Sequence, residues 1–175
     1  MPSKPGTPRT LGFAVWSDDV ALVRELLDVG VRVDDYGSDT TDVTPLMESV
    51  NELEPFYDAD RVVVTQLLLS AGADVSRRDK TGRTALHYAV GAGRKAVEIL
   101  LAAEADVDAE ADGGVTPLHE AVTRGNPAAI EALCRGGANR GARDGLGRTP
   151  AGLLAEDEDT YTPQERAALN AMLAG

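Results

Sequence analysis

The chain has 175 residues and a formal net charge of -12, from 29 acidic and 17 basic side chains. Apolar residues make up 43% and charged residues 26%, which is an ordinary globular composition in which a core can form. Because aromatic residues contribute only 4%, we expect a core of Ala, Leu and Val in closely packed helices, not an all-β fold. The length fits one domain. We expect so acidic a chain not to bind nucleic acid, because it would repel the phosphate backbone.

A single cysteine, Cys134, excludes an intramolecular disulfide framework and a multi-cysteine zinc site, and it agrees with a reducing compartment. Residues 1–8 lack the apolar stretch of a secretory signal, and no run approaches the ~18 apolar residues that span a bilayer. We therefore expect a cytoplasmic protein without membrane contact, in which residues 1–9 form a flexible tail. Arg outnumbers Lys 14 to 3, which weakly indicates a bacterial source with a GC-rich genome.

A four-residue pattern recurs along the chain. Its copies are Thr44-Pro45-Leu46-Met47, Thr84-Ala85-Leu86-His87, Thr116-Pro117-Leu118-His119 and Thr149-Pro150-Ala151-Gly152, with Leu11-Gly12 as a degenerate copy upstream. The threonines are 40, 32 and 33 residues apart. Thr is a preferred helix N-cap and Pro fits the first helical turn, so each copy predicts the start of a helix. The capping box Thr162-Pro163-Gln164-Glu165 predicts the start of a last helix.

A leucine pair followed by a turn comes after each copy. The pairs are Leu26-Leu27 before Gly30, Leu68-Leu69 before Gly72, Leu100-Leu101 before Glu104, and Leu133-Cys134 before Gly137. Gly takes the left-handed conformation after a helix most readily, so the three glycines predict where each second helix ends. Glu104 departs from this pattern and leaves the geometry of its cap open.

These linked signals resemble the ankyrin repeat, a β-turn followed by two antiparallel helices with a period near 33 residues. The resemblance covers residues 10–175 and implies an all-α solenoid of helix-turn-helix units joined by β-turn fingers. The units fall at about 10–34, 35–76, 77–109, 110–142 and 143–175, with degenerate caps at both ends. It also implies a monomer that binds a partner protein through a concave surface of first helices and finger tips.

The spacing is irregular in two places. The finger around residues 34–43 carries about two extra residues, and about seven are inserted between the helices of the second unit, in residues 51–60. This insertion sets Phe56 and Tyr57 among acidic residues, an arrangement typical of interface hot spots. We predict that it contacts the partner. The alternative is that both aromatics fold back over the apolar flank of Val62 and Val63.

The sequence contains no motif for catalysis, a cofactor or a metal. The alternating acids of residues 106–113 imitate a calcium loop, but Ala111 and Pro117 stand where an EF-hand needs Gly and a bidentate Glu. No glycine-rich phosphate loop, G-x-S-x-G elbow or H-E-x-x-H motif occurs. We predict a protein that is not an enzyme, although an enzyme using the acidic insertion stays an alternative.

Three residues with reactive side chains, two histidines and one cysteine, have structural interpretations. His87 and His119 are the only histidines, and the resemblance implies that each ties a helix start to the neighbouring turn through hydrogen bonds. Cys134 takes the place of a leucine, so we expect a buried and inert thiol with no basic residue placed to lower its pKa.

Charge is distributed unevenly. Residues 18–60 hold 13 acids and 2 bases, whereas residues 61–103 hold 3 acids and 7 bases. The acids either keep the surface soluble or steer a partner with a basic surface. A sharper form of the second interpretation is an immunity or antitoxin protein that inhibits a basic toxin or enzyme.

The predicted partner-binding residues lie on the first helices, the fingers and the insertion. They are Trp16, Thr40, Asn51, Glu52, Glu54, Phe56, Tyr57, Asp58, Lys80, Arg83, Tyr88, Thr123 and Arg124. Trp16 and Tyr88 each have two interpretations, because an aromatic residue at these positions serves either partner contact or packing between units.

Overall fold

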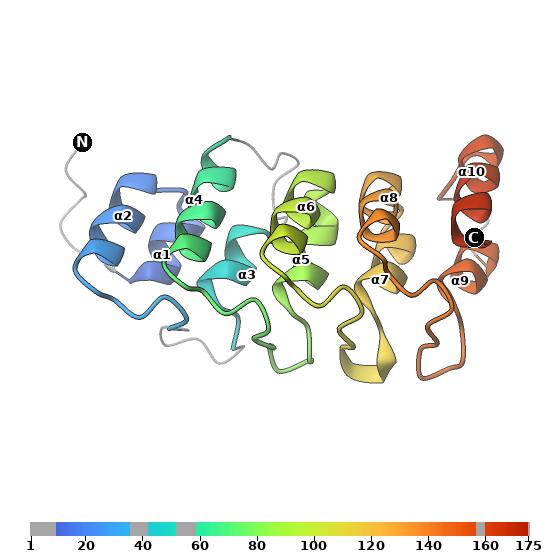
Figure 1. Cartoon of the computed structure of the whole chain (residues 1–175), viewed down its shortest axis with the longest axis horizontal. Coiled ribbons are helices and arrows are strands. Elements are labelled where there is room, and N and C mark those ends of the chain that lie inside the picture. The colour runs from blue at the N-terminus through green and yellow to red at the C-terminus, as the bar shows by residue number, and fades with distance from the viewer. Residues whose placement is uncertain (1–9, 36–41, 52–58, 157–159, 175) are drawn as a thin grey trace.

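The structure is a computed structural model that describes residues 10–35, 42–51, 59–156 and 160–174. In these residues ten α-helices follow one another, arranged as five pairs in single file (Figure 1). They are α1 (Leu11–Trp16), α2 (Val20–Asp28), α3 (Pro45–Ser49), α4 (Ala59–Ser70), α5 (Ala85–Ala92), α6 (Arg94–Ala102), α7 (Pro117–Thr123), α8 (Pro127–Arg135), α9 (Pro150–Glu156) and α10 (Pro163–Ala174). The predicted all-α solenoid is confirmed.

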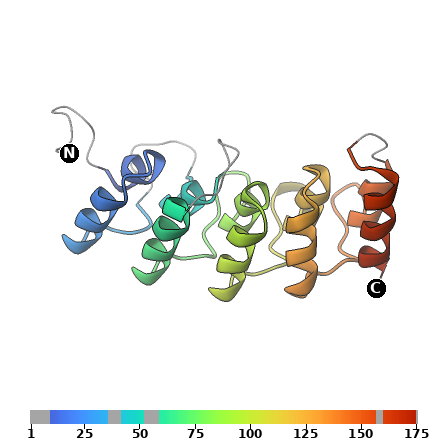
Figure 2. The same cartoon turned by 90° about the horizontal axis from the view of Figure 1, so that it is seen from above.

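The helices form two rows. The first-helix row contains α1, α3, α5, α7 and α9, and the second-helix row contains α2, α4, α6, α8 and α10 (Figure 2). The principal contacts run within a pair, as between α5 and α6, or along a row, as between α5 and α7. The fingers project from one edge of the stack, and the single β-bridge in the described residues, between Ala111 and Val115, closes one of them.

The repeated threonines start the first helices as predicted. Thr44 Oγ1 accepts a hydrogen bond from the N–H of Met47 at 3.1 Å, and Thr149 Oγ1 accepts one from Gly152 at 3.1 Å. The capping box of α10 is also present, because Thr162 Oγ1 accepts from the Glu165 N–H while Glu165 Oε2 accepts from the Thr162 N–H. These side chains satisfy amide groups that the first turn of a helix leaves without partners.

The second helices end in left-handed residues. Gly30, Gly72 and Gly137 have φ of 84°, 86° and 89°, as the sequence predicts. Glu104 takes the same conformation with φ of 62°, and the following Ala105 N–H still bonds to the Leu100 carbonyl at 3.0 Å. The cap that the sequence leaves open is therefore formed, at the cost of holding a side chain in a region that favours Gly.

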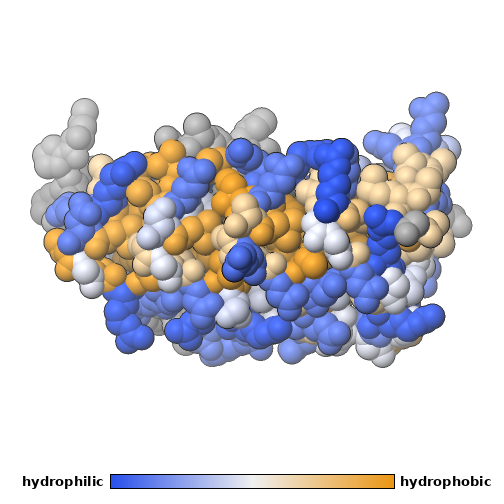
Figure 3. Space-filling model, in the orientation of Figure 1, coloured by the Kyte–Doolittle hydropathy of each residue, from blue (hydrophilic) through white to orange (hydrophobic). Residues whose placement is uncertain are grey.

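Small and branched residues fill the interior. Ala14, Ala89 and Ala121 are fully buried and let the first helices approach closely. On the second-helix row, Leu68 of α4 and Leu100 of α6 are also fully buried. The fingers form a hydrophilic edge, whereas a broad apolar band crosses α2, α4 and α6 (Figure 3). Among the described helices, none has both the length and the apolar character needed to cross a bilayer.

Candidate functional site

The two histidines link the third helix pair to the fourth and the fourth to the fifth. His87 Nδ1 accepts the Thr84 N–H at 3.1 Å, and its Nε2 lies 3.0 Å from the Val115 carbonyl oxygen on the following finger. His119 repeats this arrangement with the Thr116 N–H and the Arg148 carbonyl, at 3.3 and 3.1 Å. Burial is the main cause that lowers the pKa of His87, against the opposing effects of Val115 and Glu120. The predicted structural role of both side chains is confirmed.

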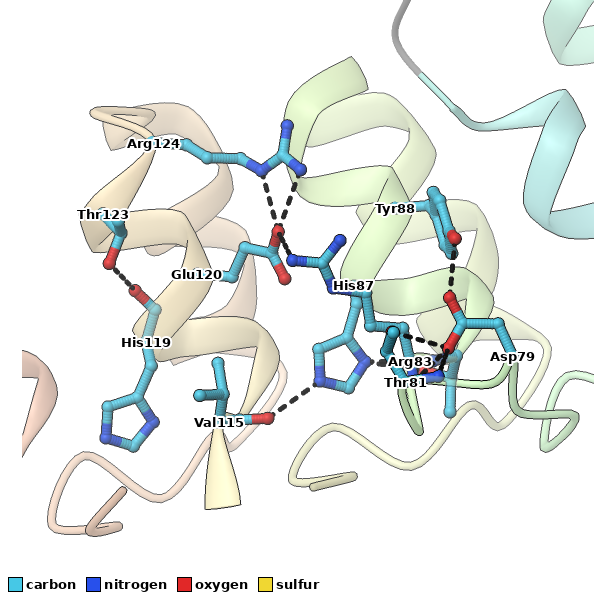
Figure 4. A network of polar contacts seen from close by, with 11 residues as sticks. Asp79, Thr81, Arg83, His87, Tyr88, Val115, His119, Glu120, Thr123 and Arg124 are labelled. Carbon is cyan, nitrogen blue, oxygen red and sulfur yellow. Dashed lines mark hydrogen bonds and ion pairs between the residues drawn. The ribbon is translucent and has the colours of Figure 1, made fainter. Parts of the chain in front are cut away.

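A polar network joins the third and fourth pairs on the first-helix row (Figure 4). It begins in the finger before α5, where Asp79 Oδ1 accepts the N–H groups of Thr81 and Arg83 at 2.7 and 2.9 Å. Asp79 Oδ2 accepts the hydroxyl of Tyr88 at 2.7 Å. Burial would raise the pKa of Asp79, but the hydrogen bonds from Tyr88, Thr81 and Arg83 outweigh it and hold the pKa below its usual value.

The network continues across the pair boundary through Glu120. The Arg83 Nη2 lies 3.3 Å from Glu120 Oε1, and Arg124 donates from Nε and Nη2 to the same oxygen at 3.0 and 2.9 Å. Figure 4 shows the two guanidinium groups reaching this atom from two sides. Glu120 is 7% exposed, and its other oxygen, Oε2, is buried without a hydrogen-bond partner in the described residues.

The fifth pair offers a comparison at equivalent positions. Asp144 and Arg148 stand five residues and one residue before Thr149, as Asp79 and Arg83 do before Thr84. Here Arg148 Nε donates to Asp144 Oδ2 at 2.9 Å, so the arginine pairs with its own finger. Leu153 stands where the third pair has Tyr88, and it has no hydroxyl that could bond to Asp144 in place of Arg148.

A comparison with protein-family models matches residues 56–144, half of the chain, to ankyrin repeats in three copies. Together with the repeated helix pairs and the histidine links, this match decides the family. The chain is an ankyrin repeat protein. Ankyrin repeats are generally protein–protein interaction modules and typically have no catalytic function.

The ankyrin stack places several predicted contact residues on the first-helix row and its fingers. Trp16 is 57% exposed at the end of α1, and its ring centroid lies 5.7 Å from that of Phe13. Lys80 and Thr123 are exposed, and Asn51 is half-buried beyond α3. Tyr88 is half-buried and bonded to Asp79, so its hydroxyl serves the network.

The remaining predicted contact residues lie outside the described residues. These are Thr40, Glu52, Glu54, Phe56, Tyr57 and Asp58, together with the predicted tail of residues 1–9. Their roles stay predictions. Sequence reasoning missed Asp79 and Glu120, although the four-residue spacing of Glu120 and Arg124 on one helix was an available signal.

Cys134 and the acids of residues 106–113 have local structural roles. Cys134 is buried as predicted, and burial raises the pKa of its thiol. Arg140 opposes that increase through its charge and a hydrogen bond, which corrects the expectation that no basic residue lies near the thiol. Asp108 Oδ1 accepts the Asn139 N–H at 2.8 Å and so joins two fingers. No group of three His, Cys, Asp or Glu side chains within the described ranges could hold a metal ion.

Proposed function

We propose that this ankyrin repeat protein is a non-catalytic scaffold that binds a partner protein through its first-helix row, its finger tips and the insertion of the second unit. The observation that carries the proposal is the exposure of Trp16, 57%, on α1. Trp16 is the only Trp in the chain, and stacking of the units does not account for the exposed part of its surface. Trp is enriched among residues that dominate binding energy, so Trp16 is the expected anchor.

The proposed partner has a basic surface. Asp19, Asp28 and Asp35 are exposed on the first pair and the finger that follows, on the same part of the stack as Trp16. Acidic groups around an aromatic anchor attract positively charged partners at long range and accelerate encounter. The association rate constant should therefore fall as salt rises, since charges are screened over ~8 Å at physiological ionic strength. A rate that does not change with salt would assign the acids to solubility.

Paired variants on the two helix rows test the binding surface. Trp16→Ala removes the proposed anchor, and Val29→Ala is the matched control, because Val29 is 71% exposed directly after α2 on the other row. Affinity capture followed by mass spectrometry identifies the proteins retained by wild type, and titration calorimetry measures each variant against them. We expect Trp16→Ala to weaken binding by ~2 kcal/mol or more and Val29→Ala to leave it unchanged. Equal effects of both, with unchanged melting, would contradict the proposal.

An inhibitor of a basic toxin or enzyme is the second candidate function, favoured by the 13 acids and 2 bases of residues 18–60. The same captured partner distinguishes the two functions. An inhibitor abolishes the partner's activity in stoichiometric amounts, whereas a scaffold leaves that activity in place. We further propose that the free protein is a cytoplasmic monomer, which fractionation and analytical ultracentrifugation test.

A further inference from the structure

Arg83 and Arg124 come from neighbouring ankyrin units and meet at one atom, Oε1 of Glu120. We propose that this arginine pair binds the carboxylate of an Asp or Glu side chain of the partner protein. The inference deepens the proposed function by naming the chemistry of one contact. It rests on that function because the carboxylate is assigned to the proposed partner protein.

The arginine pair has charge and donors left for a ligand. Two guanidinium groups share the single negative charge of Glu120, and their side chains are 41% and 42% exposed. In the part of the chain that the structure describes, Nε and Nη1 of Arg83 and Nη1 of Arg124 donate no hydrogen bond. Guanidinium donors match carboxylate oxygens in geometry and charge, so these groups suit an incoming carboxylate.

Glu120 fixes the two arginines in place. Its side chain is buried, and Oε1 accepts two hydrogen bonds from Arg124 and forms an ion pair with Arg83. Oε2 stays buried without a partner among the described residues, which costs stability. A buried oxygen without a hydrogen bond destabilises the fold, so the presence of Glu120 at this position needs a reason other than folding stability. Holding two guanidinium groups at the first-helix row supplies that reason.

Tyr88 positions Arg83 by bonding to Asp79, the acid that competes with Glu120 for the Arg83 side chain. In the fifth unit, which has Leu153 at this place, Arg148 pairs with Asp144 of its own finger. In the third unit the Tyr88 hydroxyl takes Asp79 Oδ2 at 2.7 Å. Arg83 then extends to Glu120 in the next unit instead of turning back to Asp79.

The distribution of charge makes this the favourable place for an acidic side chain. Residues 61–103 hold 7 bases and 3 acids, whereas the segments on both sides are acidic. A partner with a basic surface against the first two units and one acidic side chain at the arginine pair can bind in only one direction along the stack. Like charges repel in the reversed orientation.

Propionate is a probe for this site, because it carries the carboxylate of a Glu side chain without a partner protein. Propionate is titrated into the full-length protein at constant ionic strength with chloride as the balancing anion, and the Nε–Hε resonances of the arginines are followed by NMR. We expect a saturable shift for Arg83, whose Nε donates no hydrogen bond among the described residues, and none for Arg148, whose Nε is already bonded to Asp144. The Nε of Arg124 is bonded to Glu120, so the contribution of Arg124 is read from its variant. Shifts of equal size at Arg83 and Arg148, or no shifts, would overturn the proposal. Inorganic phosphate runs in parallel, and tighter binding of phosphate would assign the site to phosphate instead.

Variants test the roles of the individual residues. Arg83→Gln and Arg124→Gln should each weaken propionate binding by roughly tenfold or more, the equivalent of one charge-assisted hydrogen bond. Tyr88→Phe should also weaken it, because Asp79 is released to recapture Arg83. Adding Asp79→Asn to Tyr88→Phe removes that competing charge and should restore binding, which also shows that loss of the hydroxyl leaves the fold intact. Unchanged affinity in Tyr88→Phe, or no recovery in the double variant, would contradict the positioning role. The titration contains no partner protein, so its outcome is independent of the capture experiment.

Discussion

His87 supports the stack through both of its ring nitrogens. Nδ1 accepts the Thr84 N–H, so Nε2 carries the proton that reaches the Val115 carbonyl. Protonation of Nδ1 removes the acceptor and places a charge in a buried site. A neutral His87 is therefore part of the folded state.

We predict that folding stability depends on pH through His87. Burial lowers its folded pKa below the ordinary value of 6.5, so the unfolded chain binds this proton more readily than the folded chain. The contribution of His87 is complete above about pH 6.5 and decreases as the pH falls below that value. His87→Ala should cost ~1–3 kcal/mol at pH 7.5, and this cost should shrink at pH 5. Urea unfolding of both proteins at the two pH values measures it, and an equal cost at both would contradict the prediction.

Glu104 provides a second prediction, concerning backbone strain. Its φ of 62° is held by a side chain where the equivalent positions have Gly30, Gly72 and Gly137. Glu104→Gly should raise the free energy of unfolding by ~1 kcal/mol, because Gly takes this conformation without a steric penalty. Gly72→Ala is the matched control, since its φ is 86° with nothing within 4 Å of an added Cβ, and it should lower stability by a similar amount. A destabilised Glu104→Gly would show that the side chain has another role.

At the scale of elements, the insertion of the second unit remains a predicted contact. We expect Phe56→Ser with Tyr57→Ser to weaken partner binding by ~2–4 kcal/mol and to leave the melting temperature nearly unchanged. The reason is that units three and four join their helices without such a segment, through Gly93 and through residues 124–126. Calorimetry and thermal melting together separate the alternatives, because residues packed over Val62 and Val63 would give lost stability with preserved affinity.

Helix boundaries could be predicted from the sequence because their causes are local. Thr44 caps a helix that begins one residue later, and Gly72 ends one through its own backbone conformation. Each of these effects acts within a few residues, so a short motif contains it. The histidine links were predicted in another way, from the resemblance to ankyrin repeats, because Val115 and Arg148 lie 28 and 29 residues beyond His87 and His119.

The arginine pair could not be predicted in this way. Arg83 and Glu120 are 37 residues apart, and their contact depends on whether Asp79 is already occupied by Tyr88. A Glu four residues before an Arg on a helix is ordinarily a solvated pair. Only the stacking of one unit on the next buries Glu120 and brings Arg83 to it.

At the scale of the whole molecule, stability comes from neighbours. Among the described helices the principal contacts of each pair are with adjacent pairs, and the last pair covers α7 and α8 through contacts of α9 with α7 and of α10 with α8. The Tyr161 hydroxyl also donates to the Val122 carbonyl at 2.8 Å, which ties the last pair to the fourth. The last pair therefore acts as a cap on the apolar face behind it.

Removing residues 143–175 should expose that face and cause self-association. Light scattering and sedimentation velocity would detect it, with a deletion of residues 1–9 as the control that keeps every described helix. A truncated protein that stays monomeric with unchanged helicity per residue would show that the fourth pair is an adequate end for the stack.

The position of Trp16 determines what optical experiments on this protein report. As the only Trp in the chain, it lies in the first of five helix pairs. Tryptophan fluorescence therefore follows one end of the stack, whereas circular dichroism averages over all of its helices. In a molecule held together by neighbouring contacts the two signals need not change at the same temperature. An earlier transition in fluorescence would identify fraying that begins at the amino-terminal end.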